Sequence, residues 1–230
     1  LPKERELIKE FSEEDTVIFG TPVIAGRVPN VLIKYISSLK GNGAKAIPIV
    51  LYGNRNYDDA LIELRNLLER DGFHTVAAAA FVGEHSFSKI LAKGRPDKED
   101  LDVAAHFAKK IGDKLLNGGL CSPIEVKGNP NPSVYYQPRD KEGNAINILK
   151  VKPKTREICT SCKLCSDICP MGSISHDNTR EVSGICIKCC ACIKKCPVDA
   201  KYFDDSGFLI HKEDLEEKFK DIRREIETFL

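Results

Sequence analysis

Apolar residues in the first half of the chain fall into two alternating patterns. Three short runs are rich in aliphatic and β-branched residues and are typical of strands buried on both faces; they span residues 15–20, 45–52 and 74–82. In four other segments apolar residues recur every three or four positions, which predicts helices; these span residues 3–11, 28–39, 58–70 and 97–116. Because helices and strands alternate, the pattern predicts parallel strands joined by right-handed crossovers.

Residues with turn and capping preferences mark the ends of the predicted helices. Gly41–Gly43 and Asp71–Gly72 follow the second and third helices. The long helix begins at Asp97 and stops before Gly118. Pro48 is awkward in the middle strand, because proline has no N–H for the hydrogen-bond ladder.

The second half of the chain has a different composition. Residues 119–155 contain five prolines with several Gly and Asn, which predicts a linker, and a hairpin is expected within 135–151 with its turn at 141–144. Apolar residues at four–three spacing predict a last helix over about 212–229; they are Leu215, Phe219, Ile222, Ile226 and Phe229. We expect this stripe to pack on one of the domains, with a dimer seam as the alternative.

Composition and charge limit the class of protein. A length of 230 residues with 42% hydrophobic residues suits one or two domains with a sizeable core. The net charge of +1 argues against general nucleic-acid binding, and the sequence has no run of 18 apolar residues to predict a membrane span. The start does not resemble a signal peptide, so the ten cysteines indicate a reducing cytoplasm. The oligomeric state is left undetermined.

Eight of the ten cysteines form two runs with the same spacing, offset by 27 residues. In each run, three cysteines are separated by two residues and a fourth, followed by proline, comes after three more. The runs are Cys159, Cys162, Cys165 and Cys169, then Cys186, Cys189, Cys192 and Cys196. This spacing is a bacterial iron–sulfur signature. The short steps let a looping backbone aim three sulfurs at one point, and the longer step turns the fourth away.

Two other uses of these cysteines fit the pattern less well. Structural zinc sites usually take two separated pairs of ligands. Disulfides need an oxidising compartment, and cysteines this close in sequence seldom pair comfortably. Of the two remaining cysteines, Cys121 is expected to be an unpaired thiol and Cys190 a small buried filler. The lone His85 and His176 are expected to be polar surface or core residues.

The cysteine-rich stretch closely resembles the two-cluster bacterial-type ferredoxin, and the resemblance extends to residues 170–174 and 197–202 after the runs. In that family the fourth cysteine of each run binds the other cluster. The resemblance therefore implies two [4Fe–4S] clusters. One would be held by Cys159, Cys162, Cys165 and Cys196, and the other by Cys186, Cys189, Cys192 and Cys169.

Three loops follow the predicted strands, at residues 20–27, 53–58 and 83–88. In an open parallel sheet, ligands bind outside the carboxyl ends of the strands. The loops are rich in small polar residues and include Tyr57, as a flat ring ligand would require. They resemble the flavin-facing loops of a flavodoxin. A flavodoxin-like domain followed by a two-cluster ferredoxin resembles the flavodoxin–ferredoxin fusion family.

This second resemblance implies an FMN site. Tyr57 would stack on the flavin ring, or it is an ordinary aromatic residue at a helix start. Backbone groups of five residues would bond the polar edge of the ring; they are Thr21, Ala25, Gly26, Gly53 and Asn54. The loop that cradles the FMN phosphate in flavodoxins has no counterpart here. Either an N-terminal segment is missing, or the domain has lost its flavin and serves as a docking platform. We expect this chain to bind FMN weakly or not at all, and a longer chain to bind it.

The predicted fold class is an α/β flavodoxin-like parallel sheet, incomplete at its N-terminus, plus a small α+β two-cluster ferredoxin domain. The predicted ranges are 1–118 for the flavodoxin-like domain, 119–155 for the linker, 156–205 for the ferredoxin domain and 206–230 for the C-terminal helix. The leading hypothesis is electron transfer to or from FMN or redox partner proteins. A flavin-dependent reductase with its own substrate is the alternative, and a scaffold stapled by its clusters is a third.

The charge is locally uneven. Residues 151–201 carry nine Lys and Arg against five Asp and Glu. A solvated basic surface accounts for this excess. The functional alternative is that four lysines steer an acidic redox partner or favour a reduced cluster; they are Lys163, Lys188, Lys194 and Lys195.

Overall fold

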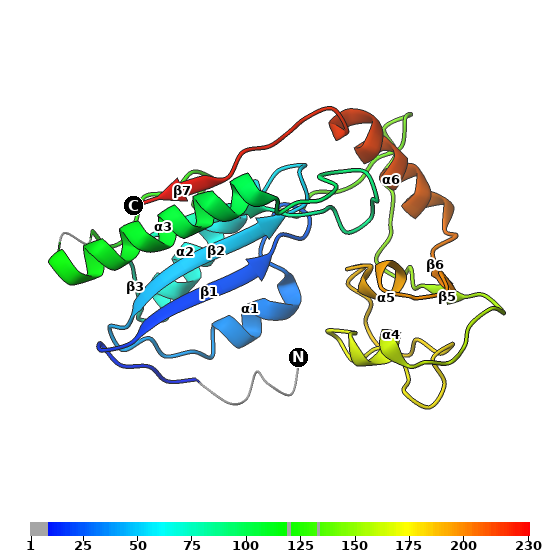
Figure 1. Ribbon diagram of the computed structural model, residues 1–230, viewed down its shortest axis with the longest axis horizontal. Coiled ribbons are helices and arrows are strands. Elements are labelled where there is room, and N and C mark those ends of the chain that lie inside the picture. Colours follow the sequence, from blue (N-terminus) through cyan, green and yellow to red (C-terminus); the bar gives the residue numbers. More distant parts are fainter. Residues whose placement is uncertain (1–8, 119–120, 133) are drawn as a thin grey trace. The chain divides into compact units, whose positions relative to one another are not determined.

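The computed structural model describes residues 9–118, 121–132 and 134–230 (Figure 1). These residues form two compact units. The first, here called the sheet unit, comprises the described residues within 9–85, 90–136 and 221–230. The second, the cysteine unit, comprises residues 86–89 and 137–220. The segment predicted as a linker is therefore divided after residue 136, with its first part in the sheet unit.

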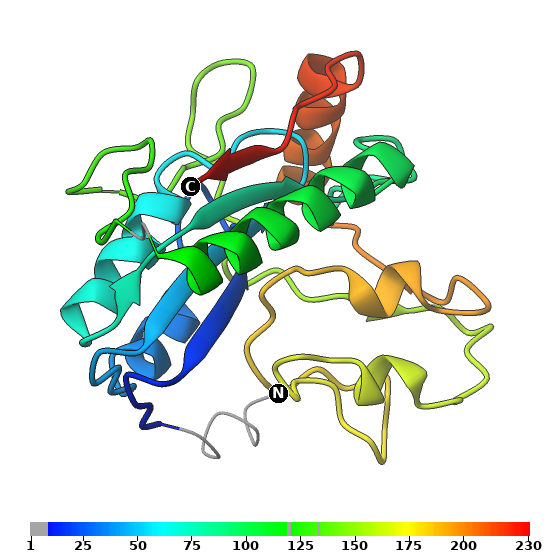
Figure 2. The same ribbon diagram turned by 60° about the vertical axis from the view of Figure 1, so that its left-hand side comes forward.

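The sheet unit contains a mixed, mostly parallel sheet. Its parallel strands are β1 (Thr16–Pro22), β2 (Lys45–Tyr52), β3 (His74–Thr75) and β4 (Ala78–Val82). β2 is central and pairs with the other three. The antiparallel strand β7 (Glu227–Phe229) pairs with β4 (Figure 2). Together with its helices the sheet makes this unit an α/β structure, as the alternating pattern predicts.

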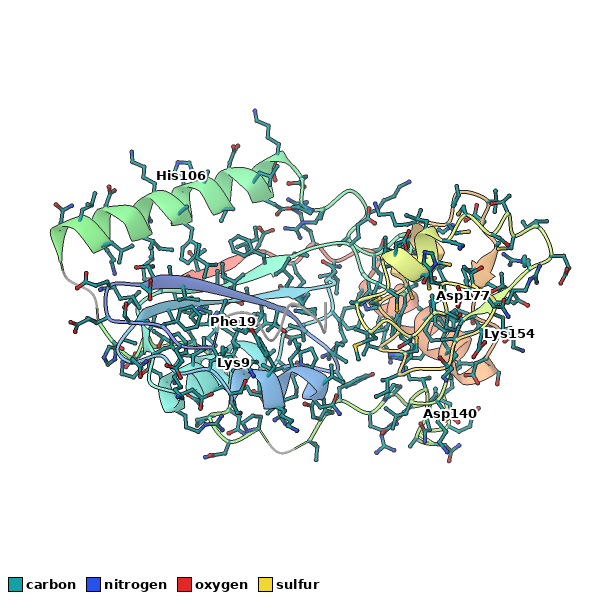
Figure 3. All side chains as sticks on the ribbon, turned by 90° about the horizontal axis from the view of Figure 1, so that it is seen from below. Lys9, Phe19, His106, Asp140, Lys154 and Asp177 are labelled. Carbon is teal, nitrogen blue, oxygen red and sulfur yellow. The ribbon has the colours of Figure 1, made fainter. Side chains whose placement is uncertain are left out.

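Helices cover both faces of this sheet (Figure 3). They are α1 (Asn30–Ile36), α2 (Ala60–Arg70) and α3 (Lys98–Asn117). α1 and α2 pack on one face, where Leu64 and Leu68 are fully buried. α3 packs on the other face through Phe107 and Ile111, and His106 points away from the sheet. Burying these apolar stripes stabilises the layers.

Pro48 explains why one predicted strand appears as two. Ala46 of β2 pairs with Thr75 of β3, and Ile49 of β2 pairs with Ala79 of β4. Between these two pairs β2 advances three residues and the partner chain advances four, so the partner chain contains one extra residue. The N–H of Val76 donates to the Ala46 carbonyl, with an N···O distance of 3.0 Å. In a parallel ladder the next bond would come from the N–H of residue 48, which proline lacks. The strand predicted over 74–82 is interrupted at this place.

The long helix α3 has the cap that its sequence predicts. The Asp97 carboxylate accepts a hydrogen bond from the Asp100 N–H, and the Asp100 carboxylate accepts one from the Asp97 N–H. Gly118 follows the helix with a φ of 77°. Only glycine adopts such a backbone at little cost, so the helix stops there.

The cysteine unit is built from short elements. They are β5 (Lys154–Thr155), α4 (Leu164–Asp167), α5 (Ala191–Lys194), β6 (Lys201–Tyr202) and α6 (Ser206–Phe219). β5 and β6 pair antiparallel. The expected hairpin is reduced to a single bridge between Arg139 and Ala145, around a turn in which the Gly143 N–H donates to the Asp140 carbonyl.

The prediction of one C-terminal helix over 212–229 is wrong in its second half. α6 ends at Phe219, and residues 227–229 form β7 instead. Phe229 packs against the main core of the sheet unit. Pairing with β4 satisfies backbone groups at an otherwise open sheet edge, and this long-range gain outweighs the local helical periodicity.

The predicted helix over 3–11 falls mostly outside the described residues. Its last part, residues 9–11, is not helical, because Glu10 forms a parallel bridge with Lys40 and the Phe11 N–H donates to the Lys40 carbonyl. Within the part of the chain that the structure describes, none of the helices combines the length and the hydrophobicity needed to cross a membrane.

Candidate functional site

The two cysteine runs repeat in backbone conformation as well as in sequence. α4 and α5 occupy equivalent positions, 27 residues apart. Three pairs of residues at the same offset have a left-handed backbone; they are Ser161 and Lys188, Lys163 and Cys190, and Gly172 and Asp199. A non-glycine residue rarely adopts a positive φ, so its recurrence at matched positions marks a shared loop geometry around each run.

Hydrogen bonds to sulfur follow the same repeat. The Ser173 N–H donates to Cys169 Sγ (N···S 3.4 Å), and the Ala200 N–H donates to Cys196 Sγ (N···S 3.2 Å). Burial raises the pKa of the Cys196 thiol, but nearby backbone N–H groups outweigh burial, and the net pKa is lowered. These donors favour the thiolate, which is the form that binds metals.

Four of the predicted ligands lie around one small cavity in the cysteine unit. Cys159, Cys162 and Cys165 of the first run line it together with Cys196, the last cysteine of the second run. The structure therefore brings together the four residues of one predicted ligand set, from parts of the chain more than 30 residues apart. Cys165 is buried, whereas Cys162 is exposed.

Cysteines of the other predicted set influence one another across the two runs. Burial raises the pKa of the Cys189 thiol, and the neighbouring Cys186 and Cys169 raise it further. Burial, with Cys189 and Cys186, also raises the pKa of Cys192 to about 12. Cys169 of the first run is thus close enough to the second run to affect it. Such mutual repulsion between thiolates is relieved when a cationic metal centre binds them.

The geometry does not match a site for one metal ion. Among the described residues, no three His, Cys, Asp or Glu side chains converge closely enough to hold a single ion. In a four-iron cluster each thiolate binds a different iron, so its ligands surround one cluster without lying close enough together to hold a single ion. Four cysteines line the cavity, and the Ala200 N–H donates to one of their sulfurs, Cys196 Sγ; this is the donor chemistry that such a cluster takes.

Two lysines of the cysteine unit are buried, and the sequence did not predict this. Lys188 is 9% exposed, and its Nζ donates to the carbonyls of Cys186 and Leu149, both at 2.9 Å. Lys201 is 3% exposed and lines the cavity described above. Lys188 therefore does not belong to a steering surface, whereas Lys195 is exposed.

The remaining cysteines and histidines have simpler surroundings. Cys190 is buried, as predicted for a small filler, and its thiol donates to the Lys188 carbonyl (S···O 3.5 Å). Cys121 is exposed. His176 lies on the surface, with its Nε2 3.6 Å from a carboxylate oxygen of Asp167.

Two of the three loops predicted to face a flavin, 20–27 and 53–58, contribute to a cleft in the sheet unit, and the loop 83–88 does not line it. Ala25, Gly26 and Tyr57 line it. Sequence reasoning missed four of the ten residues that line it, because they come from distant segments; they are Lys127, Val134, Tyr136 and Glu227. Local patterns carry no signal for such long-range contacts.

The other predicted flavin-binding residues do not line this cleft. Thr21 is 1% exposed. The Asn54 side chain is bonded to the C-terminal segment, because its Nδ2 donates to the Ile222 carbonyl (2.6 Å) and its Oδ1 accepts from the Arg224 N–H (3.1 Å). A Cβ added to Gly53 would lie 2.6 Å from the Cα of His85, so a glycine is required there for packing.

Tyr57 is a core residue in this structure. It is 5% exposed, and its ring packs on Tyr52 with 5.5 Å between the ring centroids. Burial and the adjacent carboxylate of Glu227 raise the pKa of its hydroxyl well above the usual value. The ring thus takes the position of a structural aromatic residue and offers no open face.

Both arginines near the cleft are engaged with carboxylates. Arg27 forms a two-point ion pair with Glu63 and lies 4.9 Å from the ring centroid of Tyr135. Arg55 pairs with Asp58 and lies over the ring of Tyr136 at 4.6 Å. Neither guanidinium is free of a counter-charge, so they are poor candidates to hold a phosphate.

The comparison with protein-family models adds no name to these sites. No family model matches the chain.

Proposed function

We propose that this protein is an electron-transfer protein that carries two [4Fe–4S] clusters in its cysteine unit. One cluster would be held by Cys159, Cys162, Cys165 and Cys196, and the other by Cys186, Cys189, Cys192 and Cys169. The observation that carries the proposal is the position of Cys196 in the same cavity wall as the three cysteines of the first run. Crossed ligand sets of this kind are typical of two-cluster ferredoxins.

A bound cluster supplies one-electron chemistry, in which an electron is accepted from a low-potential donor and passed to an acceptor without making or breaking bonds. The protein supplies the thiolates and the N–H donors that stabilise their charge. The exposed Cys162 brings one edge of the site to the surface, where a partner could approach. The exposed Lys195 favours an acidic partner.

The proposal does not require FMN. The cleft of the sheet unit is lined by two of the predicted edge-binding residues, Ala25 and Gly26. However, the Tyr57 ring is buried, and Arg27 and Arg55 are paired with carboxylates. A stacked ring alone would contribute too little for tight binding. We therefore keep FMN as a hypothesis for a longer chain and assign electron transfer to the clusters.

The first test combines composition with ligand replacement. Anaerobically prepared protein should contain about eight iron and about eight acid-labile sulfide per chain. Cys196→Ser should lower the iron content towards about four and remove the spectroscopic signal of the centre shared with the first run. Cys190→Ala is the matched control, because this neighbouring cysteine is buried but lies outside both ligand sets, and it should keep both centres.

Two outcomes would contradict the proposal. Stoichiometric zinc without sulfide would end the iron–sulfur assignment. If Cys196→Ser perturbed only the centre held by Cys186, Cys189 and Cys192, the crossed ligand sets would be wrong.

A further inference from the structure

Lys201 is a buried cation that donates hydrogen bonds to two neutral oxygens. It is 3% exposed, and its Nζ donates to Thr155 Oγ1 at 2.8 Å and to the Thr179 carbonyl. Among the residues that the structure describes, no carboxylate forms an ion pair with it. A buried ammonium group without a counter-charge is costly, and it persists where another negative charge compensates it.

Cysteines of one predicted ligand set would supply such a negative charge as thiolates. Lys201 lines the same cavity as Cys159, Cys162, Cys165 and Cys196. Its side chain is therefore placed to compensate the charge of the thiolates in this ligand set.

The repeat shows that the local fold does not need a lysine here. The equivalent residue of the first run, 27 positions earlier, is Ile174, which is 5% exposed. A lysine at one position and an isoleucine at the other show that the fold accepts an apolar side chain at this point. The charge at Lys201 is thus a feature of this site and not of the loop geometry.

We propose that Lys201 raises the reduction potential of the centre bound by Cys159, Cys162, Cys165 and Cys196. The inference rests on the proposed function. Uptake of one electron from a donor adds one negative charge to the thiolate-bound centre and breaks no bond. A fixed ammonium group lining the same cavity stabilises that added charge, and its burial limits screening by water and salt.

The experiment is to measure both reduction potentials by EPR-monitored titration of anaerobic Lys201→Met, which keeps the length of the side chain and removes its charge. The potential of one centre should fall, with a change of about tenfold in the one-electron equilibrium constant, or about 59 mV. The larger fall should belong to the centre that Cys196→Ser removes. Most of this difference in reduction potential between the variant and the wild type should persist at high salt concentration.

Lys195→Met is the matched control, because Lys195 precedes Cys196 in sequence but is exposed. Its effect should be smaller and should vanish at high salt. An unchanged or higher potential in Lys201→Met, or a shift equal to that of the control, would overturn the inference. Wild-type protein without iron and sulfide would instead overturn the proposed function.

Lys201→Ile provides a second variant in case Lys201→Met does not assemble, since isoleucine fills the equivalent place in the first run. If neither variant retained the iron and sulfide of the wild type, Lys201 would be a structural residue and the inference would be wrong.

Discussion

The sheet unit and the cysteine unit are each stabilised by a different kind of interaction. Both hydrophobic core clusters of the described residues lie entirely in the sheet unit, where they fill the space between the sheet and its helices. Apart from α6, the cysteine unit contains only two-residue strands and four-residue helices among its described elements, and few of its apolar side chains are fully buried. A region that buries so little apolar surface needs another source of stability. Two clusters, each joining both cysteine runs, would provide it.

Removal of the iron should have the largest effect on stability, and this effect should differ between the two units. We expect anaerobic chelation of iron to unfold residues 156–205, because their crossed links are lost, while the sheet unit keeps its protection. Hydrogen exchange followed by mass spectrometry on the full chain measures both units at once. Equal protection of residues 156–205 before and after iron removal would show that this region does not depend on its cysteines.

A cavity in the core of the sheet unit should have the opposite effect to iron removal, because it should destabilise the sheet unit and leave the cysteine unit intact. Leu64→Ala removes a side chain that is 0% exposed in α2 and should destabilise the sheet unit by about 2–5 kcal/mol. The iron and sulfide content should not change. Leu116→Ala is the control, because Leu116 is 86% exposed, and its effect should stay within about 0.5 kcal/mol. Urea unfolding monitored by circular dichroism gives both values; loss of iron in Leu64→Ala would mean that the units are not independent.

The smallest effect concerns pH and the start of α3. A hydrogen bond from Arg223 and the Asp100 N–H lower the pKa of Asp97 to about 2, from an ordinary value of 3.8. A carboxyl group with a depressed pKa contributes stability above its unfolded pKa and loses it as the pH falls through the folded one. Asp97→Asn should therefore lower the urea midpoint above about pH 4, and the difference from wild type should shrink towards about pH 2.

Asp102→Asn, on the exposed surface of the same helix, is the control for the loss of one carboxylate charge and should change the urea midpoint less than Asp97→Asn at neutral pH. A constant difference between Asp97→Asn and wild type from pH 6 to pH 2 would show that the Asp97 charge is not responsible.

The sequence by itself determined the features that depend on short stretches of chain. The bounds of β2 and the Asp97 cap are as predicted, because hydrophobic runs and capping residues act within a few positions. The 27-residue offset of the cysteine runs recurs in α4, α5 and the left-handed residues, because equal spacing imposes equal loop geometry. Lys201 could also have been singled out from sequence, by aligning the two runs and noting that it replaces Ile174.

Only the tertiary structure decided the features that depend on distant partners. The periodicity of residues 215–229 is helical, yet residues 227–229 pair with β4, because an open sheet edge offers backbone bonds that no local pattern reveals. Tyr57 is buried for the same reason, since Glu227 of that strand lies beside it. The charge environment of Lys201 likewise depends on Thr155 and Thr179, which the fold brings from positions 46 and 22 residues away. Burial and pairing across such separations are properties of the folded chain and not of any segment.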